Sequence, residues 1–309
     1  MYPRSGPYAR RVTLSLPVRR RSRSAAFVAL TKPRIIELLL ITTVPTMIVA
    51  DQGVPSVWLM IATVAGGTLA AGGANAINMY IDRDIDALME RTRSRPLVTG
   101  EIQPTEALVF AIGLEIAAFA WLSLVVNLLS AVLAVAATLF YVFVYSLWLK
   151  RRSTSNIVIG GAAGAVPVLV GWAAVRNELD WAPLVLFAII FCWTPPHFWA
   201  LAIKYRDDYA AAGVPMLPAV VSTRSTAVRI VAYTVVLWAT TLVLQPVAGL
   251  GLLYLVSALV LGAAFLFHAL RVLRAPTAAH AMTLFTFSIT YITLLFGAMA
   301  LDQVIRTGA

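Results

Sequence analysis

Three polar side chains in a mostly apolar segment, Asn78, Asp82 and Asp86, follow one another at intervals of four residues. An α-helix has about 3.6 residues per turn, so these side chains project from one face, whereas Asp84 points elsewhere. Oxygen ligands without cysteine or clustered histidine suit a hard cation, above all Mg²⁺. Because Mg²⁺ favours a few carboxylates plus substrate phosphate, the spacing predicts a magnesium and diphosphate site.

A second acidic pair, Asp207 and Asp208, occurs much later in the chain. A clamp for Mg²⁺ and diphosphate also needs cations, which bind the phosphate oxygens. The candidate cations are Lys32, Arg34, Arg91, Arg95, Lys150, Arg151, Lys204 and Arg206. For each of them, the ordinary excess of basic residues on the inner side of a membrane protein is a competing explanation. The acids, too, could simply solvate a helix end.

The elements that carry these residues must be membrane helices. Of the 309 residues, 60% are hydrophobic and 12% are charged, and the mean hydropathy is +0.84. Soluble domains carry about 25% charged residues. Lipid offers no partner to unpaired backbone groups, so apolar runs of about 20 residues are helices. The runs predict about nine spans, at 35–50, 56–80, 106–126, 130–149, 155–175, 182–203, 227–244, 247–270 and 281–300.

The positive charge follows this predicted topology. With a cytoplasmic N-terminus, every Lys and Arg except Arg176 and Arg306 falls in an inside segment, in agreement with the positive-inside rule. The net charge of +10 therefore indicates topology and not a nucleic-acid partner. Both acidic groups lie at cytoplasmic ends of spans four helices apart. This arrangement predicts two four-helix repeats plus one helix, around a central cavity open to the cytoplasmic side.

The N-terminal residues 1–24 are rich in Arg and Ser and contain no acid. They lack the apolar core of a secretory signal, so we expect a disordered, basic cytoplasmic tail, with a mitochondrial transit peptide as the alternative. Residues 25–309 are expected to form the membrane domain. The one cysteine, Cys192, is expected to be a small apolar filler and leaves the redox compartment open.

Together these residues resemble the UbiA superfamily of intramembrane prenyltransferases. The likeness runs from about Leu30 to the end of the chain and rests on residues 30–40, 78–86, 91–97, 149–161, 167–172, 193–201, 205–209 and 215–218. The Asn and Asp pattern at 78–86 identifies only the superfamily. The sequence WTPPHFWAL at 193–201, in register with YRDDY at 205–209, resembles the branch that farnesylates heme. The superfamily's second motif is often Asp-x-x-x-Asp, whereas this chain has two adjacent aspartates.

The resemblance implies farnesyl diphosphate as the donor, protoheme IX as the acceptor and heme O as the product, with Mg²⁺ as cofactor. It implies that Asp82, Asp86 and Asp208 hold the metal while Asn78 orients them, and it favours Asp208 over Asp207. Fixed positive charge at the leaving diphosphate would come from Lys150, Arg151, Arg91 and Arg95. Lys32, Arg34 and Lys204 are further candidates for binding this substrate.

Three tyrosines near predicted cytoplasmic helix ends are Tyr80, Tyr141 and Tyr145. A prenyl carbocation needs a dry cavity rich in π electrons, and these rings could line it. Tyr145 is the one we assign to the substrate site. Anchoring of the rings at the membrane interface is an equally good explanation.

His197 lies inside a predicted span, directly after Pro195 and Pro196. The resemblance implies that it contacts heme, as an axial ligand or as the base that handles the water added to the vinyl-derived cation. The alternative is a polar residue that pairs with backbone groups freed by the prolines. His268 and His280 are expected at the surface. No c-type heme attachment motif occurs, so heme is expected as substrate and not as a resident cofactor.

Two other functions fit part of the sequence. A quinone or other aromatic prenyltransferase of the same superfamily would share the diphosphate site, and an ion-coupled transporter would share the repeats and intramembrane acids. Against transport, the acids lie at helix ends and not near the middle of the membrane. The expected location is a plasma membrane, or the mitochondrial inner membrane in a eukaryote. Heme A synthase and oxidase assembly proteins are possible partners implied by the resemblance.

Overall fold

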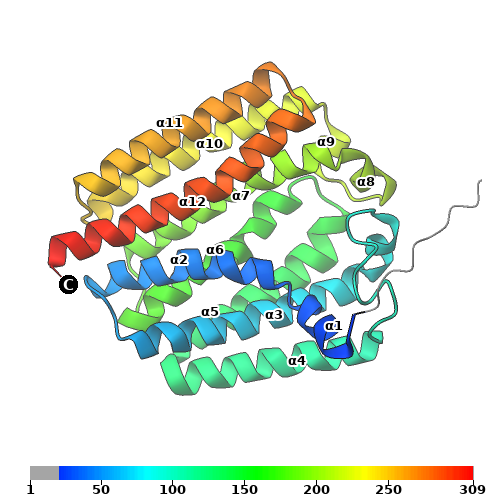
Figure 1. Cartoon of the computed structure of the whole chain (residues 1–309), viewed down its shortest axis with the longest axis horizontal. Helices are drawn as coiled ribbons and strands as arrows, with labels where there is room; N and C mark the ends of the chain where they lie inside the picture. Colours follow the sequence, from blue (N-terminus) through cyan, green and yellow to red (C-terminus); the bar gives the residue numbers. More distant parts are fainter. Residues whose placement is uncertain (1–20, 309) are drawn as a thin grey trace, which may run out of the picture.

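The computed structural model describes residues 21–308, apart from the side chains of residues 34–40. Within this part of the chain every regular element is a helix, which confirms the predicted all-α membrane fold. The elements are α1 (Arg23–Leu30), α2 (Pro33–Asp51), α3 (Val57–Leu88), α4 (Pro104–Trp121), η1 (Leu122–Val126), α5 (Leu128–Leu139), η2 (Phe140–Trp148), η3 (Leu149–Arg151), α6 (Asn156–Arg176), α7 (Trp181–Lys204), α8 (Arg206–Ala211), α9 (Leu217–Val220), α10 (Thr223–Val247), α11 (Leu252–Arg274) and α12 (Ala278–Thr307) (Figure 1).

Eight of the described helices are long and apolar enough to cross a membrane, and they correspond to the second to ninth predicted spans. They are α3, α4 with η1, α5 with η2 and η3, α6, α7, α10, α11 and α12. The first predicted span, 35–50, falls within α2, whose described apolar part is limited to Ile41–Asp51. The protein is therefore a multi-pass membrane protein, and the predicted count of nine spans is not confirmed.

Side-chain caps set where several helices begin. A capping oxygen accepts a hydrogen bond from a first-turn N–H that has no partner within the helix, which stabilises the helix by about 1 kcal/mol. The caps are Ser22 for α1, Ser56 for α3, Asp180 for α7, Ser222 for α10 and Thr277 for α12. Helix α1 thus begins at Arg23, just before the predicted end of the tail at residue 24. Residues 1–20 of that tail lie outside the described residues.

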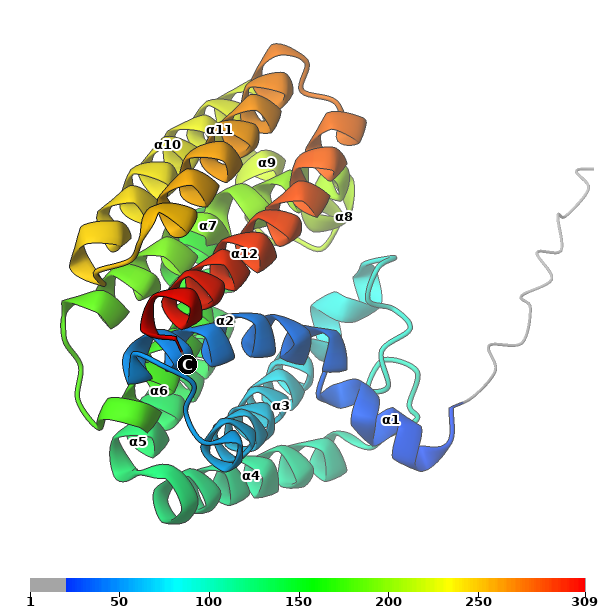
Figure 2. The same ribbon diagram turned by 60° about the vertical axis from the view of Figure 1, so that its left-hand side comes forward.

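Helices α2, α6 and α7 form the middle of the bundle. α6 packs against α7 and α2, and it also contacts α5. α3, α4 and α5 lie on one side of this middle layer, and α10, α11 and α12 lie on the other (Figure 2). α12 contacts both α2 and α7, so the last helix of the chain packs against the first long one.

Glycines allow the close helix approaches within the bundle. A Cβ atom at Gly262 in α11 would lie 2.0 Å from the Trp238 ring of α10. A Cβ atom at Gly171 in α6 would lie 2.9 Å from the backbone oxygen of Thr43 in α2. Small residues are the usual contact points between membrane helices. Apolar side chains are as stable in lipid as between helices, so helices associate mainly through close backbone packing, which small residues allow. The large apolar side chains instead cover much of the outer surface, as on α4.

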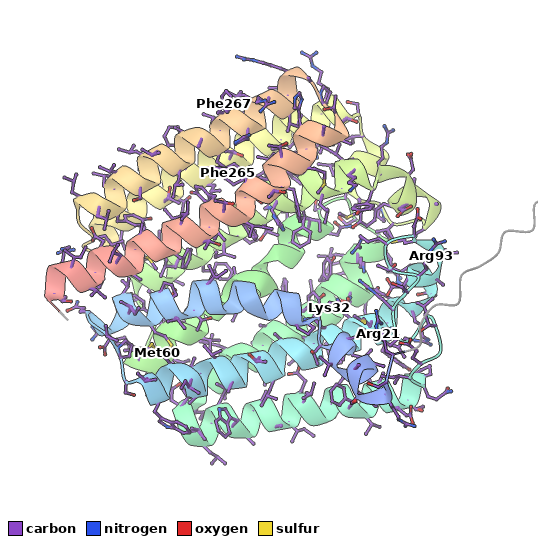
Figure 3. All side chains as sticks on the ribbon, viewed as in Figure 1. Arg21, Lys32, Met60, Arg93, Phe265 and Phe267 are labelled. Atoms are coloured by element: carbon purple, nitrogen blue, oxygen red, sulfur yellow. The ribbon has the colours of Figure 1, made fainter. Side chains whose placement is uncertain are left out.

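One end of the bundle carries nearly all of the short elements. We call it the motif end: it comprises α1, the 89–103 loop between α3 and α4, α8, α9 and the helix ends beside them (Figure 1). Figure 3 shows Arg21 and Arg93 at this end, with Lys32 where α1 meets α2. Arg21 joins the N-terminal segment to the loop by pairing with Glu101 and donating to the Ser94 backbone oxygen. The predicted acidic motif lies at the same end, in the last turns of α3.

Candidate active site

The last turns of α3 bury the three motif residues on one face, as predicted. Asn78, Asp82 and Asp86 are 3%, 0% and 2% exposed. The Asp84 side chain, by contrast, is 61% exposed. Buried carboxylates are costly unless they are paired with cations, and the surroundings of Asp82 and Asp86 supply that pairing.

Each buried acid has its own cation. Lys150, in η3, forms an ion pair with Asp82, and Arg95, in the 89–103 loop, forms one with Asp86. Thr92 fixes the loop beside Arg95 by donating a hydrogen bond to the backbone oxygen of Asp86 at 3.0 Å. The two charged partners therefore reach α3 from two different segments of the chain.

Asn78 joins three segments through its carboxamide. Its Oδ1 accepts a hydrogen bond from Lys32 Nζ at 3.1 Å, at the α1–α2 junction. Its Nδ2 donates to Asp82 Oδ2 at 2.7 Å and to Ser146 Oγ of η2 at 3.1 Å. Ser146 was not predicted, because nothing in the sequence of an apolar helix marks one serine as facing the site. The orienting role of Asn78 stays a prediction, and its hydrogen bond to Asp82 is the contact through which it would act.

One buried oxygen in the site has no hydrogen-bond partner. Asp82 Oδ2 bonds to Lys150 and Asn78, whereas Asp82 Oδ1 is buried and accepts no hydrogen bond, with Arg151 Nη2 4.0 Å away. A hard cation takes such carboxylate oxygens, and Mg²⁺ needs only one or two carboxylates when phosphate supplies further ligands. Asp82 and Asp86 therefore fit the predicted Mg²⁺ site.

The second acidic pair lies at the same end but does not join this group. Asp207 is exposed and Asp208 partly buried in α8, and among the described residues neither forms an ion pair. Nor do any three acids, histidines or cysteines in the described part of the chain come close enough to hold a metal ion together. The predicted set of Asp82, Asp86 and Asp208 is thus not assembled in this arrangement.

The shortest contacts of the remaining predicted cations are with other side chains than Asp82 and Asp86. Arg91 and Lys204 both lie near the Tyr205 ring, with Arg91 Cζ 5.9 Å and Lys204 Nζ 5.3 Å from its centroid. Arg151 forms a two-point pair with Asp84, at 2.6 and 2.7 Å. The side chain of Arg34 lies outside the described residues.

Two of the three predicted tyrosines lie together. Tyr141 and Tyr145 of η2 stack with centroids 5.3 Å apart, and Lys150 Nζ is 6.0 Å from the Tyr145 ring. η2 is π-helical, a wider turn often found at functional sites, and periodicity alone did not predict it. Gly160 makes room for Tyr145, since a Cβ atom there would lie 2.2 Å from the ring. Tyr80 instead packs with the residues of α1 and α4.

Lys32 provides a pH-dependent contact. Its burial, with the nearby positive charges of Arg95 and Lys150, lowers the pKa of Lys32 from 10.5 to about 7. A bound diphosphate favours the charged amine and raises this pKa, so binding takes up a proton. We therefore expect pyrophosphate affinity, measured calorimetrically with Mg²⁺, to fall as pH rises from about 7.5 to 9.5. The fall should be at most about tenfold per pH unit, as for one proton.

Lys32→Arg is the control for this prediction, because arginine keeps its charge throughout that range. Its affinity should change little with pH. Equal pH slopes in the two proteins would show that Lys32 does not titrate on binding.

His197 lies apart from the acids, between α7 and α12. Its ring stacks between Trp193 and Phe285, with centroid distances of 4.3 and 4.5 Å, and its Nδ1 lies 2.6 Å from Ser288 Oγ. This pairing with a side chain of α12 differs from the predicted alternative, in which the ring would bond to backbone freed by the prolines. Nε2 has no hydrogen bond among the described residues, and it remains the nitrogen that could contact a ligand.

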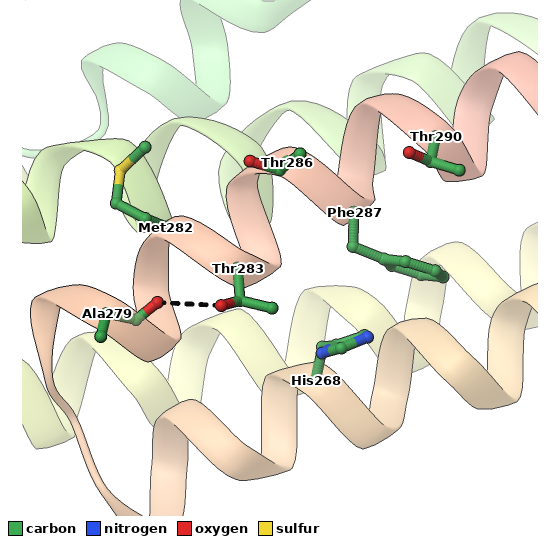
Figure 4. Close-up of a pocket in the computed structure, with 7 residues that line it drawn as sticks. All are labelled: His268, Ala279, Met282, Thr283, Thr286, Phe287 and Thr290. Atoms are coloured by element: carbon green, nitrogen blue, oxygen red, sulfur yellow. Dashed lines mark hydrogen bonds between the residues drawn. The ribbon is translucent and has the colours of Figure 1, made fainter.

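A surface groove lies between α11 and α12. It is lined by His268, Ala279, Met282, Thr283, Thr286, Phe287 and Thr290 (Figure 4). His268 faces Phe287 at 4.7 Å, and Thr283 bonds back to the Ala279 oxygen. The groove lining holds no carboxylate, so it lacks the ligands that the motif end offers to a metal and diphosphate.

Comparisons with known proteins show the family of this chain. The model of the UbiA prenyltransferase family matches residues 39–296. A relative from Frankia alni, called protoheme IX farnesyltransferase, is 56% identical over 91% of this chain and 98% of its own. One of the same name from Kineococcus radiotolerans is 52% identical over 93% and 90%.

Solved structures show the same fold. A digeranylgeranylglyceryl phosphate synthase has a TM-score of 0.75 at 17% identity, covering 92% of this chain and 99% of its own. A UbiA homolog from Archaeoglobus fulgidus bound to GPP and Mg²⁺ has a TM-score of 0.59 at 15% identity, covering 89% and 99%.

Proposed function

This chain belongs to the UbiA prenyltransferase family, and we propose that it transfers the farnesyl group of farnesyl diphosphate to a vinyl group of protoheme IX, giving heme O. The observation that carries the proposal is the buried set of Asn78, Asp82 and Asp86, with a cation for each acid. The relatives with the name protoheme IX farnesyltransferase, at more than half identity over most of the chain, support heme as the acceptor.

The residues of the motif end would act on the leaving diphosphate. Magnesium, when bound, would neutralise the charge that grows on the diphosphate as the allylic C–O bond breaks. Asp82 and Asp86 would hold it, and Asn78 would keep Asp82 in place. Lys150 would supply positive charge next to the same oxygens, and Lys32 would do so once it has taken up its proton on binding. Such charges stabilise the leaving group without reorganising during the reaction.

The acceptor would bind nearer the aromatic residues of α7 and α12. His197 offers Nε2 to heme or to the water that adds to the vinyl-derived cation, and Ser288 holds its ring through Nδ1. Tyr141 and Tyr145 would face the prenyl cation with their π electrons. Asp208 would join the metal site by a movement of α8, which is short and lies at the surface of the bundle.

The positive-inside distribution supports a cytoplasmic orientation of the motif end. The charged clusters of the chain gather at this end, on the 89–103 loop, η3 and α8. This orientation would place the diphosphate site on the side where soluble prenyl diphosphates and Mg²⁺ are found. A plasma membrane is the location that we propose, since the relatives are bacterial.

The test compares two acceptors. Membranes that contain the protein are incubated with farnesyl diphosphate and Mg²⁺, together with either protoheme IX or 4-hydroxybenzoate, and the products are separated by chromatography and mass spectrometry. We expect heme O from protoheme and no prenylated benzoate. Membranes with the Asp82→Ala variant are the control. Prenylated benzoate without heme O would instead identify a quinone-type prenyltransferase.

A further inference from the structure

Asp84 belongs to the motif segment of α3 but has no place in the proposed reaction. Its side chain points away from the buried face and is 61% exposed. It nevertheless forms a two-point ion pair, in which both carboxylate oxygens accept hydrogen bonds from the Arg151 guanidinium at 2.6 and 2.7 Å. Two-point pairs of this kind hold an arginine in one orientation.

The position of Arg151 matters because Asp82 Oδ1 is buried and accepts no hydrogen bond. Arg151 Nη2 lies 4.0 Å from Asp82 Oδ1, just beyond hydrogen-bond distance. The same nitrogen donates to Asp84 Oδ1 at 2.6 Å and to the backbone oxygen of Ile81 at 3.0 Å. The guanidinium therefore stops short of the one oxygen of Asp82 that nothing else occupies.

If Asp84 did not hold it, Arg151 would move from this 4.0 Å contact to a direct hydrogen bond with Asp82 Oδ1. Charge-assisted hydrogen bonds are strong where water is excluded, and Asp82 is fully buried. An arginine on Asp82 Oδ1 would occupy the oxygen that a metal ion needs, and its charge would repel that ion.

We propose that Asp84 is a positioning residue that holds Arg151 away from Asp82 Oδ1 and so keeps this oxygen open for the metal ion. The inference rests on the proposed function, because it takes Asp82 to be a metal ligand. It assigns Asp84 an effect on metal affinity that passes entirely through Arg151.

A double-mutant cycle tests whether Asp84 affects metal binding through Arg151. The proteins are the wild type, Asp84→Asn, Arg151→Gln and the double variant, each purified in detergent with its thermal stability checked. Mn²⁺ serves as the probe, and its binding is measured by electron paramagnetic resonance at an inorganic pyrophosphate concentration that saturates each protein. Glu90→Gln is the matched control, since Glu90 is an exposed acid of the same end that pairs with Arg93.

We expect Asp84→Asn to weaken Mn²⁺ binding about fivefold, which is near the upper end of what a single exposed or half-exposed charge pair contributes. Glu90→Gln should bind as the wild type does. In the Arg151→Gln background, the further change of Asp84 to Asn should have no effect, because the competing guanidinium is gone.

Two results would overturn the inference alone: unchanged Mn²⁺ affinity in Asp84→Asn, or equal weakening with and without Arg151. The second would show that Asp84 acts through its own charge. A different result would contradict the proposed function: the Asp82→Ala variant would bind Mn²⁺ as tightly as the wild-type protein does. That result would overturn the metal site and the inference together.

Discussion

Replacing Asp82 with alanine is expected to abolish farnesyl transfer while the protein still inserts into the membrane. Asp82 is fully buried and is the point where Lys150, Asn78 and the proposed metal ion meet. Loss of one preorganised electrostatic group lowers rates by about 10²–10³-fold, and loss of a metal ligand adds to this. Asp86→Ala should have the same effect, because Asp86 is the other buried acid.

The ion pair with Lys150 refines the choice of variants. Removing one partner of a buried pair leaves the other charge uncompensated and can destabilise a protein by about 3–5 kcal/mol. Asp82→Asn keeps the size of the side chain, and the double variant Asp82→Asn with Lys150→Met removes the charge of the partner as well. Both should be inactive, and the double variant should melt closer to the wild type than Asp82→Ala does.

The measurement is heme O formation by membranes with matched protein levels, together with melting temperature in detergent. Asp51→Ala is the control, since Asp51 is an exposed acid at the opposite end of α2. Normal heme O formation by Asp82→Asn or Asp86→Ala would show that the replaced residue is not needed for the reaction.

Replacing His197 with alanine is expected to stop heme-dependent turnover without weakening the binding of farnesyl diphosphate. The ring lies between α7 and α12, whereas the acids and their cations belong to α3, η3 and the 89–103 loop. Loss of a general base or of an axial contact lowers the rate by about 10²–10⁴-fold. Binding of the diphosphate, measured by calorimetry, should be unchanged.

Two further variants separate chemistry from packing at this position. His197→Phe keeps a ring between Trp193 and Phe285 but has no nitrogen. Ser288→Ala keeps the imidazole and removes the partner of Nδ1. We expect His197→Phe to be as inactive as His197→Ala, and Ser288→Ala to retain part of the activity. Wild-type turnover by His197→Phe would assign His197 a packing role only.

Local periodicity was enough to predict the face formed by Asn78, Asp82 and Asp86, because all three lie on one helix. For the pairing of those acids with Lys150 and Arg95, the sequence predicted only that cations lie near the acids, and not which cation pairs with which acid. Which cation meets which acid depends on how η3 and the 89–103 loop pack against α3, and sequence spacing does not determine that. Ser146 and Gly160 were missed for the same reason.

The position of Asp208 shows a second limit. The resemblance placed it with Asp82 and Asp86, but α8 is a separate short helix after the end of α7, and its orientation is independent of the helix that carries the first motif. Likewise, the identity of Asp84 as a partner of Arg151 could not be predicted. Periodicity showed that Asp84 points away from the site, and only the packing of η3 shows what it meets there.

The separation between the ionic cluster on α3, η3 and the 89–103 loop and the aromatic cluster around His197 has an evolutionary consequence. Substitutions on α7 and α12 can alter which acceptor is bound without disturbing the groups that ionise the donor. A duplicated gene could therefore acquire a new acceptor while it keeps the old leaving-group chemistry. Related sequences should accordingly vary independently at the two clusters, with the ionic residues held constant across acceptors.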